Sequence, residues 1–232
     1  MINQTLEIIK NSPSNKKVLV ITNSSIYSSK QLINLNTMNF NKQFLDIFSV
    51  NNKLADEEKM KLIFKEIEYY KEITNNIYIP KMFSSLVKLE QLLGDNFLLV
   101  TSNIDGLHKK MGNYRVIELF DNIHHKNFLE ENITDVNTVG GVNKRKLIHT
   151  HLYAQQADII ILLGNIIKNT FFKNLIYSAK KTNKIKVIEL NNSLAPHPLI
   201  DYQFKNKIED VAPLFLELFI DIEKGIHKNI KN

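Results

Sequence analysis

Short apolar runs alternate with stretches of helical periodicity along this chain. Four runs rich in Val, Ile and Leu are typical of buried strands, because a strand covered on both faces loses its polar alternation. The runs are KVLVIT at 17–22, FLLV at 97–100, ADIIILLG at 157–164 and KIKVIEL at 184–190. A shorter run at 116–119 predicts one more strand. We expect 17–22 to be the first structured element.

The stretches between these runs predict helices. The clearest amphipathic pattern spans 54–74, with acidic residues in its first turn. Further helices are expected at 79–93, with Pro80 near its start, and at 170–182, before a closing segment at 201–222. Strands that alternate with helices in this way predict an α/β fold, a three-layer Rossmann-like sandwich with a mainly parallel sheet.

Polar residues gather directly after the run at 97–100. Asn103, Asp105 and His108 lie on or beside a short helix expected at 104–110. In an open α/β sheet, ligands bind where strands end and helices begin, so a site is expected here. The alternative is that Asn103 and Asp105 only cap the helix and close the turn.

Composition narrows the functional classes. The chain has 232 residues, 44% of them hydrophobic, which suffices for one core and a small second lobe. Its net charge of +6 comes from lysines spread along the chain rather than from one basic patch, so we expect no nucleic-acid partner. No apolar run approaches the ~18 residues of a membrane span, and the N-terminal stretch lacks the apolar core of a signal peptide. We therefore expect a cytoplasmic protein without a membrane partner.

The chain contains no cysteine. This excludes disulfides, thiolate nucleophiles and thiolate-bound zinc. The pairs His124 with His125 and His149 with His151 have spacings that could bind a metal, but spacing fixes no acidic or sulfur partner beside them. We expect these histidines to be scattered on the surface and the protein to hold no metal.

The stretch TSNIDGLHKKMGNYRVIELF at 101–120 resembles the sirtuin signature TQNIDGLHxxAG followed by a strand that ends in ELHG. Sirtuins are NAD-dependent protein deacylases, and the resemblance extends upstream through 86–95. It implies a Rossmann-like large domain formed by 1–36 and 80–232, with a small helical lobe at 37–79. It also implies NAD as cofactor and an acylated protein or peptide as partner.

The same resemblance implies roles for individual residues. Asn103 and Asp105 match the family positions that contact the nicotinamide ribose and carry the chemistry. The cofactor-binding positions that it implies are Thr22, Ser24, Ser25, Ser102, Asn103, Asp105, Gly164, Asn165 and Asn191.

The chain departs from the sirtuin pattern where catalysis depends on it. The position of the catalytic histidine, the general base of the family, holds Phe120, which has no proton acceptor. The family's glycine-rich turn GAGxS becomes 23–25 followed by Tyr27, and these larger side chains narrow the space for a pyrophosphate. Asn36 replaces the arginine that would face NAD. The four-cysteine zinc ribbon of many sirtuins has no counterpart in 126–147.

Two classes of function follow from these observations. The first is a sirtuin-fold pseudoenzyme that acts as a binding or structural module with an unknown protein partner. The second is an active NAD-dependent deacylase, protein ADP-ribosyltransferase or NAD-cleaving enzyme that uses Asn103 and Asp105. An unrelated nucleotide-binding α/β protein is a further alternative. His124 and His125 could replace the missing base, but we expect them on a turn that faces solvent.

Overall fold

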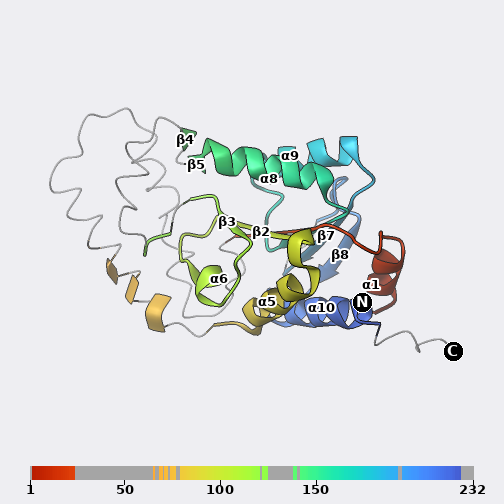
Figure 1. Ribbon diagram of the computed structural model, residues 1–232, viewed down its shortest axis with the longest axis horizontal. Coiled ribbons are helices and arrows are strands. Elements are labelled where there is room, and N and C mark those ends of the chain that lie inside the picture. The colour runs from red at the N-terminus through yellow and green to blue at the C-terminus, as the bar shows by residue number, and fades with distance from the viewer. Residues whose placement is uncertain are drawn as a thin grey trace.

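The computed structural model describes residues 2–23, 65, 68–69, 71–72, 74–76, 79–120, 122–124, 138–139, 142–192 and 195–225. Its centre is a six-stranded parallel sheet in the order β3-β2-β1-β6-β7-β8, with helices on both faces (Figure 1). This confirms the predicted three-layer α/β fold.

The strands coincide with the apolar runs. They are β1 Val18–Thr22, β2 Phe97–Thr101, β3 Val116–Glu118, β6 Ile159–Leu163, β7 Lys186–Asn191 and β8 Tyr202–Lys205. Every residue of β1, β2 and β6 is buried, because helices cover both faces of the sheet. A separate antiparallel pair consists of β4 Thr138–Val139 and β5 Val142–Asn143.

The sheet divides the core into two halves, and helices cover each half. They are α1 Ile2–Lys10, α5 Lys81–Leu93, α6 Leu107–Lys110, α8 Lys144–Gln156, α9 Thr170–Thr182 and α10 Ile208–Glu223, with a 3₁₀ turn at Gly94–Asn96. Alternate residues of a strand point to opposite faces. Val18 and Val20 therefore pack with residues of α1, α5 and α10, whereas Leu19 and Ile21 pack with residues of α8 and α9.

Two helices were not predicted from the sequence. α1 precedes β1, so the expectation that 17–22 is the first structured element is wrong. Its Ile8 and Ile9 are buried and the helix packs against α10. α8 buries only Thr150 and Ala154 fully, so its sequence carries little apolar periodicity.

The short helix expected at 104–110 begins later, at Leu107. Gly106 before it has a φ of 68°, a left-handed conformation that glycine adopts without strain and that cannot be part of an α-helix. Residues 103–106 therefore form an irregular loop at the carboxyl end of β2.

The predicted helix at 54–74 is described only in part. Residues 65, 68–69, 71–72 and 74–76 are helical, and most of the proposed small lobe at 37–79 lies outside the described residues. In the part of the chain that the structure describes, no helix has the length and apolar character needed to cross a membrane.

Candidate functional site

The loop after β2 is held by its own backbone and by β1. The Ser102 amide donates to the Thr22 carbonyl at 3.2 Å, and the Asn103 amide donates to the Thr101 hydroxyl at 3.0 Å. One carboxylate oxygen of Asp105 accepts from the Leu107 amide at 2.9 Å. Asp105 therefore closes the turn before α6, the structural role considered for it from the sequence.

The Asn103 side chain has a different environment. It is 6% exposed, and neither its Oδ1 nor its Nδ2 has a hydrogen-bond partner among the described residues. An unpaired buried polar group costs about 1–3 kcal/mol, and most such groups in native proteins have a partner. An amide that presents both a donor and an acceptor in this way suits a ligand that supplies both, so Asn103 fits the cofactor contact implied for it.

His108 lies behind this loop and connects it to β1. Its Nε2 lies 3.1 Å from the Thr22 hydroxyl, and its ring centroid lies 4.6 Å from that of Phe83 on α5. Complete burial lowers the pKa of His108 from 6.5 to about 3, so the imidazole is neutral near pH 7. His108 therefore cannot serve as a general acid or base that titrates near neutral pH.

The other predicted cofactor positions lie at the carboxyl ends of neighbouring strands. The Asn23 side chain donates to the Asn165 carbonyl at 3.3 Å, which links the turns that follow the paired strands β1 and β6. Gly164 has a φ of 95° and donates to the Leu190 carbonyl at 3.0 Å. Asn191 is the last residue of β7, and its Oδ1 accepts from the next amide at 2.8 Å. Ser24, Ser25, Tyr27 and Asn36 lie outside the described residues.

One buried carboxyl at this edge was not predicted. Glu189 lies two residues before Asn191 on β7 and is 3% exposed. It accepts from the Gln203 side chain at 2.9 Å, and burial raises its pKa above the usual value. A glutamate inside an apolar run was the only sequence signal that could have indicated it.

Phe120 lies on the turn that follows β3. This turn is attached to the loop of Asn103 at both ends: the Leu119 amide donates to the Thr101 carbonyl at 2.9 Å, and the Ile123 amide donates to the Ile104 carbonyl at 2.8 Å. Phe120 is half-buried and packs against the apolar cluster on the α8 and α9 side of the sheet. A hydrophobic ring therefore occupies the turn beside the candidate site.

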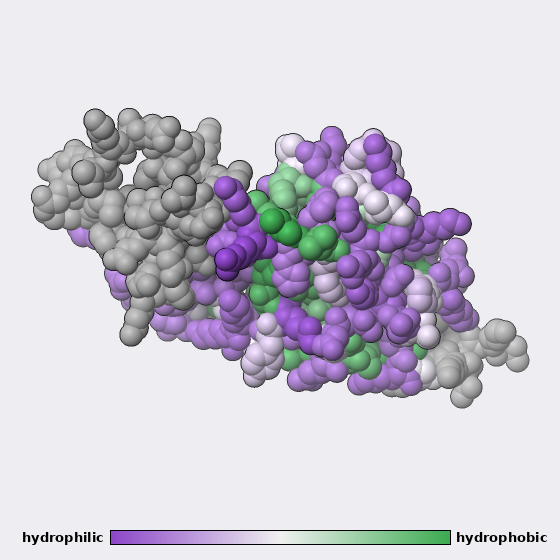
Figure 2. All heavy atoms as spheres, turned by 45° about the horizontal axis from the view of Figure 1, so that its top comes forward, coloured by the Kyte–Doolittle hydropathy of each residue, from purple (hydrophilic) through white to green (hydrophobic). Residues whose placement is uncertain are grey.

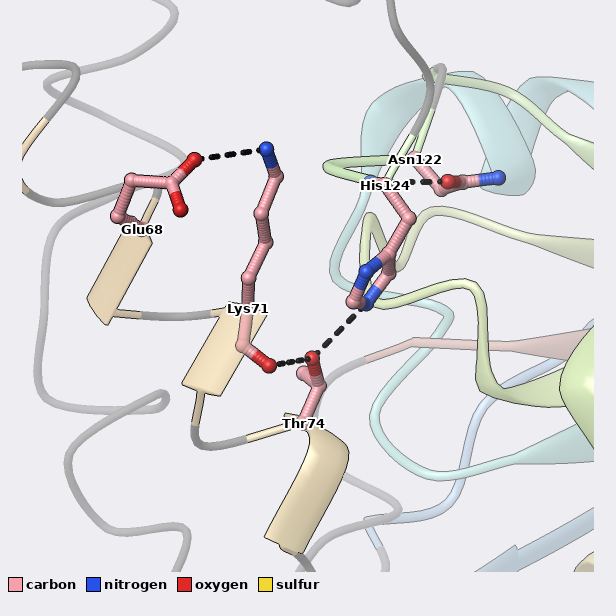
Figure 3. Close-up of polar contacts among 5 residues, drawn as sticks. All are labelled: Glu68, Lys71, Thr74, Asn122 and His124. Carbon is pink, nitrogen blue, oxygen red and sulfur yellow. Dashed lines mark hydrogen bonds and ion pairs between the residues drawn. The ribbon is translucent and has the colours of Figure 1, made fainter.

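His124, considered above as a replacement base, is bound elsewhere. Its side chain is exposed, and its Nε2 lies 2.9 Å from the Thr74 hydroxyl, which in turn donates to the Lys71 carbonyl at 3.0 Å (Figure 3). Its partial desolvation lowers the pKa of His124, and the positive charges of Lys110 and Lys71 lower it further. His125 lies outside the described residues.

The other histidine pair lies on α8, where His151 Nε2 is 3.0 Å from the side-chain nitrogen of Gln155. Among the residues that the structure describes, no group of three or more His, Cys, Asp or Glu side chains is arranged to hold a metal ion. The protein's lack of metal stays a prediction.

Comparison with solved structures identifies the fold. The structure matches a Sir2 homolog in complex with NAD with a TM-score of 0.70 and 18% identity, covering 95% of this chain and 94% of that one. It matches a structure described under the mechanism and regulation of Sir2 enzymes with a TM-score of 0.64 and 20% identity, covering 96% and 98%. The protein therefore has the Rossmann-like fold of Sir2 enzymes.

Sequence comparison points the same way. An NAD-dependent protein deacetylase of Listeria innocua is 23% identical over 182 residues, which cover 68% of this chain and 77% of the relative. An NAD-dependent protein deacylase of Salmonella typhimurium is 57% identical over 35 residues, 15% of this chain and 13% of the relative. No family model matches. This Sir2-fold chain is therefore similar in sequence to NAD-dependent protein deacetylases and deacylases, which supports the sirtuin family for it.

Proposed function

We propose that this chain is a sirtuin pseudoenzyme, which keeps the nicotinamide-ribose end of an NAD site but has lost protein deacylation. The observation that carries the proposal is Phe120. The sirtuin resemblance places the catalytic histidine at this position, and here a half-buried ring packs into the core instead. Loss of general-base catalysis alone typically lowers a rate by ~10²–10⁴-fold.

No described imidazole compensates for this loss. His108 is fully buried and contacts Thr22, and burial lowers its pKa to about 3, so its imidazole is a weak base. His124 contacts Thr74 on the helical segment at 74–76. Of the other described histidines, His151 contacts Gln155 on α8, and His197 accepts from the Leu199 amide in the segment after β7.

The two ends of the cofactor site differ in how well they suit NAD. Asn103 supports retained binding at the ribose end, because its buried amide has no partner among the described side chains. At the phosphate end, Asn23 occupies the position of the family's first glycine, and its side chain donates to the Asn165 carbonyl after β6. A pyrophosphate needs close approach of the backbone there. We therefore propose weak NAD binding that depends on Asn103.

Calorimetric titration with NAD tests the binding half of the proposal. The wild type should bind weakly, and Asn103→Ala should weaken binding by at least about tenfold, the expected effect of losing contacts to both amide atoms. Asn174→Ala, on the exposed side of α9, is the matched control and should bind as the wild type does. Absence of NAD binding by the folded wild type would contradict a retained cofactor site.

A deacylation assay tests the catalytic half separately. We expect no NAD-dependent removal of acetyl or succinyl groups from lysine peptides by the wild type. Deacylation at the rate of an ordinary sirtuin would refute the loss of catalysis, whatever the titration shows. An acylated protein or peptide remains the proposed partner class, and a neighbouring structure holds Sir2Af2 bound to a myristoylated histone peptide.

The second candidate is an active NAD-dependent enzyme, with ADP-ribosyl transfer or NAD cleavage among its reactions. The unpaired Asn103 amide and the retained Asp105 favour it, because both are family contacts to the nicotinamide ribose. Release of nicotinamide from NAD in the absence of any acylated peptide would select this alternative.

A further inference from the structure

The two faces of the sheet carry opposite charges. Helices α8 and α9 each contain three Lys or Arg residues, and neither contains Asp or Glu. On the other face, α10 contains five acidic residues and no basic one. The modest net charge of the chain therefore conceals a basic layer on the α8 and α9 side.

Apolar side chains are exposed on the same layer. Ile148 and Leu152 lie one turn apart on α8 and are 59% and 51% exposed, and Tyr177 on α9 is 51% exposed. The two helices pack side by side, and the Asn183 side chain after α9 contacts the Gln155 carbonyl near the end of α8. Figure 2 shows hydrophobic atoms gathered beside strongly hydrophilic ones on this side of the molecule.

Positive charges lie around these apolar residues. Arg145 precedes Ile148 by about one turn, and Lys173 and Lys181 lie one turn before and after Tyr177. The Lys181 ammonium lies 4.5 Å from the centroid of the Tyr177 ring. Neither α8 nor α9 contains a carboxylate, and Asp201 from outside these helices pairs with Lys180 at 2.8 Å.

We infer that the outer face of α8 and α9 docks a partner protein through an acidic amphipathic helix. An amphipathic helix binds by laying its apolar side against exposed apolar side chains, and Ile148 and Leu152 of α8 offer such side chains. Acidic residues flanking that side would meet Arg145, Lys173 and Lys181, and such charge complementarity favours the correct partner and speeds its association.

A second copy of this chain is a poorer occupant. The acidic α10 is the complementary surface, but Glu217 already contacts Lys88 and Ser85, and Glu223 contacts Lys16. Contact between unlike faces of identical chains also tends to grow into open filaments. Nucleic acid and anionic membrane fit less well, because the face offers one arginine and a single exposed ring, Tyr177, beside aliphatic side chains, rather than a row of stacking rings or bulky membrane anchors.

Selection from a displayed library of random peptides about 16 residues long tests this inference without assuming a partner. The whole protein is immobilised, and the enriched peptides are sequenced and their affinities measured. We expect acidic peptides with apolar residues at helical spacing, whose binding weakens in about 0.5 M salt. Enrichment of basic or uncharged peptides, or no enrichment, would overturn the inference.

Variants then locate the binding site. The pair Ile148→Ser with Leu152→Ser, and the pair Lys173→Glu with Lys181→Glu, should each weaken the selected peptide by at least about tenfold. Leu214→Ser on α10, 63% exposed on the opposite face, and Lys205→Glu on β8 are matched controls that should leave binding unchanged. Equal binding to all variants would overturn the proposed site.

Other occupants give different results. Tighter binding to phosphatidylserine vesicles or to duplex DNA than to the selected peptide would overturn the protein partner, and so would concentration-dependent self-association that Leu214→Ser abolishes. The inference does not depend on NAD, so the result is independent of the titration and the deacylation assay.

Discussion

The Thr22 hydroxyl lies 3.1 Å from Nε2 of His108, although the two residues are 86 positions apart in the chain. Both side chains are almost fully buried. The contact joins the carboxyl end of β1 to α6, the helix that follows the loop of Asn103. The loop of the candidate site is therefore held in place by this buried polar pair as well as by the ends of the strands.

Thr22→Val should destabilise the fold. It removes the hydroxyl and leaves the His108 imidazole without its buried partner, which we expect to lower the free energy of unfolding by about 1–3 kcal/mol. Urea unfolding followed by circular dichroism measures the change. Thr182→Val is the control, because that hydroxyl bonds the Ala179 carbonyl at the exposed end of α9 and its loss should cost less than about 0.5 kcal/mol. Equal losses in the two variants would contradict a special role for the buried pair.

The protein should become less stable as the pH decreases, because of His108. Its pKa is 6.5 in an unfolded chain and about 3 when buried, so between these values the unfolded state binds a proton that the folded state does not. The free energy of unfolding therefore decreases as pH falls from about 6.5 towards about 3, by at most about 1.4 kcal/mol per pH unit from this residue. His108→Gln should flatten that slope in urea titrations from pH 7 to 4, and an unchanged slope would argue against the shifted pKa.

Phe120→His should not restore deacylation by itself. The new imidazole supplies a base on the correct turn, but it leaves Asn23, Ser25 and Tyr27 in place of the residues of the family's phosphate-binding turn. We expect no turnover at NAD concentrations that saturate an ordinary sirtuin. Adding Asn23→Gly, Ser25→Gly and Tyr27→Ser should first strengthen NAD binding and then allow turnover. Measurable deacylation by the single variant would show that the turn still admits NAD productively.

Removal of metal should leave the protein unchanged. The chain has no cysteine, and the part of it that the structure describes brings no three ligating side chains together. A chelator should therefore not alter the thermal midpoint, because no metal binding contributes to folding. A stoichiometric zinc signal in elemental analysis of the purified protein would refute this expectation.

The sequence alone determined the architecture and the main functional question. Strands covered on both faces must be apolar throughout, so the runs at 17–22, 97–100 and 157–164 marked the sheet. The stretch from 101 to 120 marked the loop that carries Asn103, and it also showed Phe120 where the resemblance expects histidine. These features depend on local composition and residue order, which a sequence states directly.

The tertiary structure decided how the residues share their roles. The parallel register pairs Thr22 with Thr101, and His108 contacts the Thr22 side chain. No local sequence pattern encodes this contact between Thr22 and His108. The structure also separates Asp105, which closes a turn, from Asn103, whose amide has no partner in the described part of the chain. α8 escaped prediction because only Thr150 and Ala154 are fully buried on it, and its basic outer face became visible only beside α9. Such features arise where distant segments meet, so burial and pairing emerge only when the chain is folded.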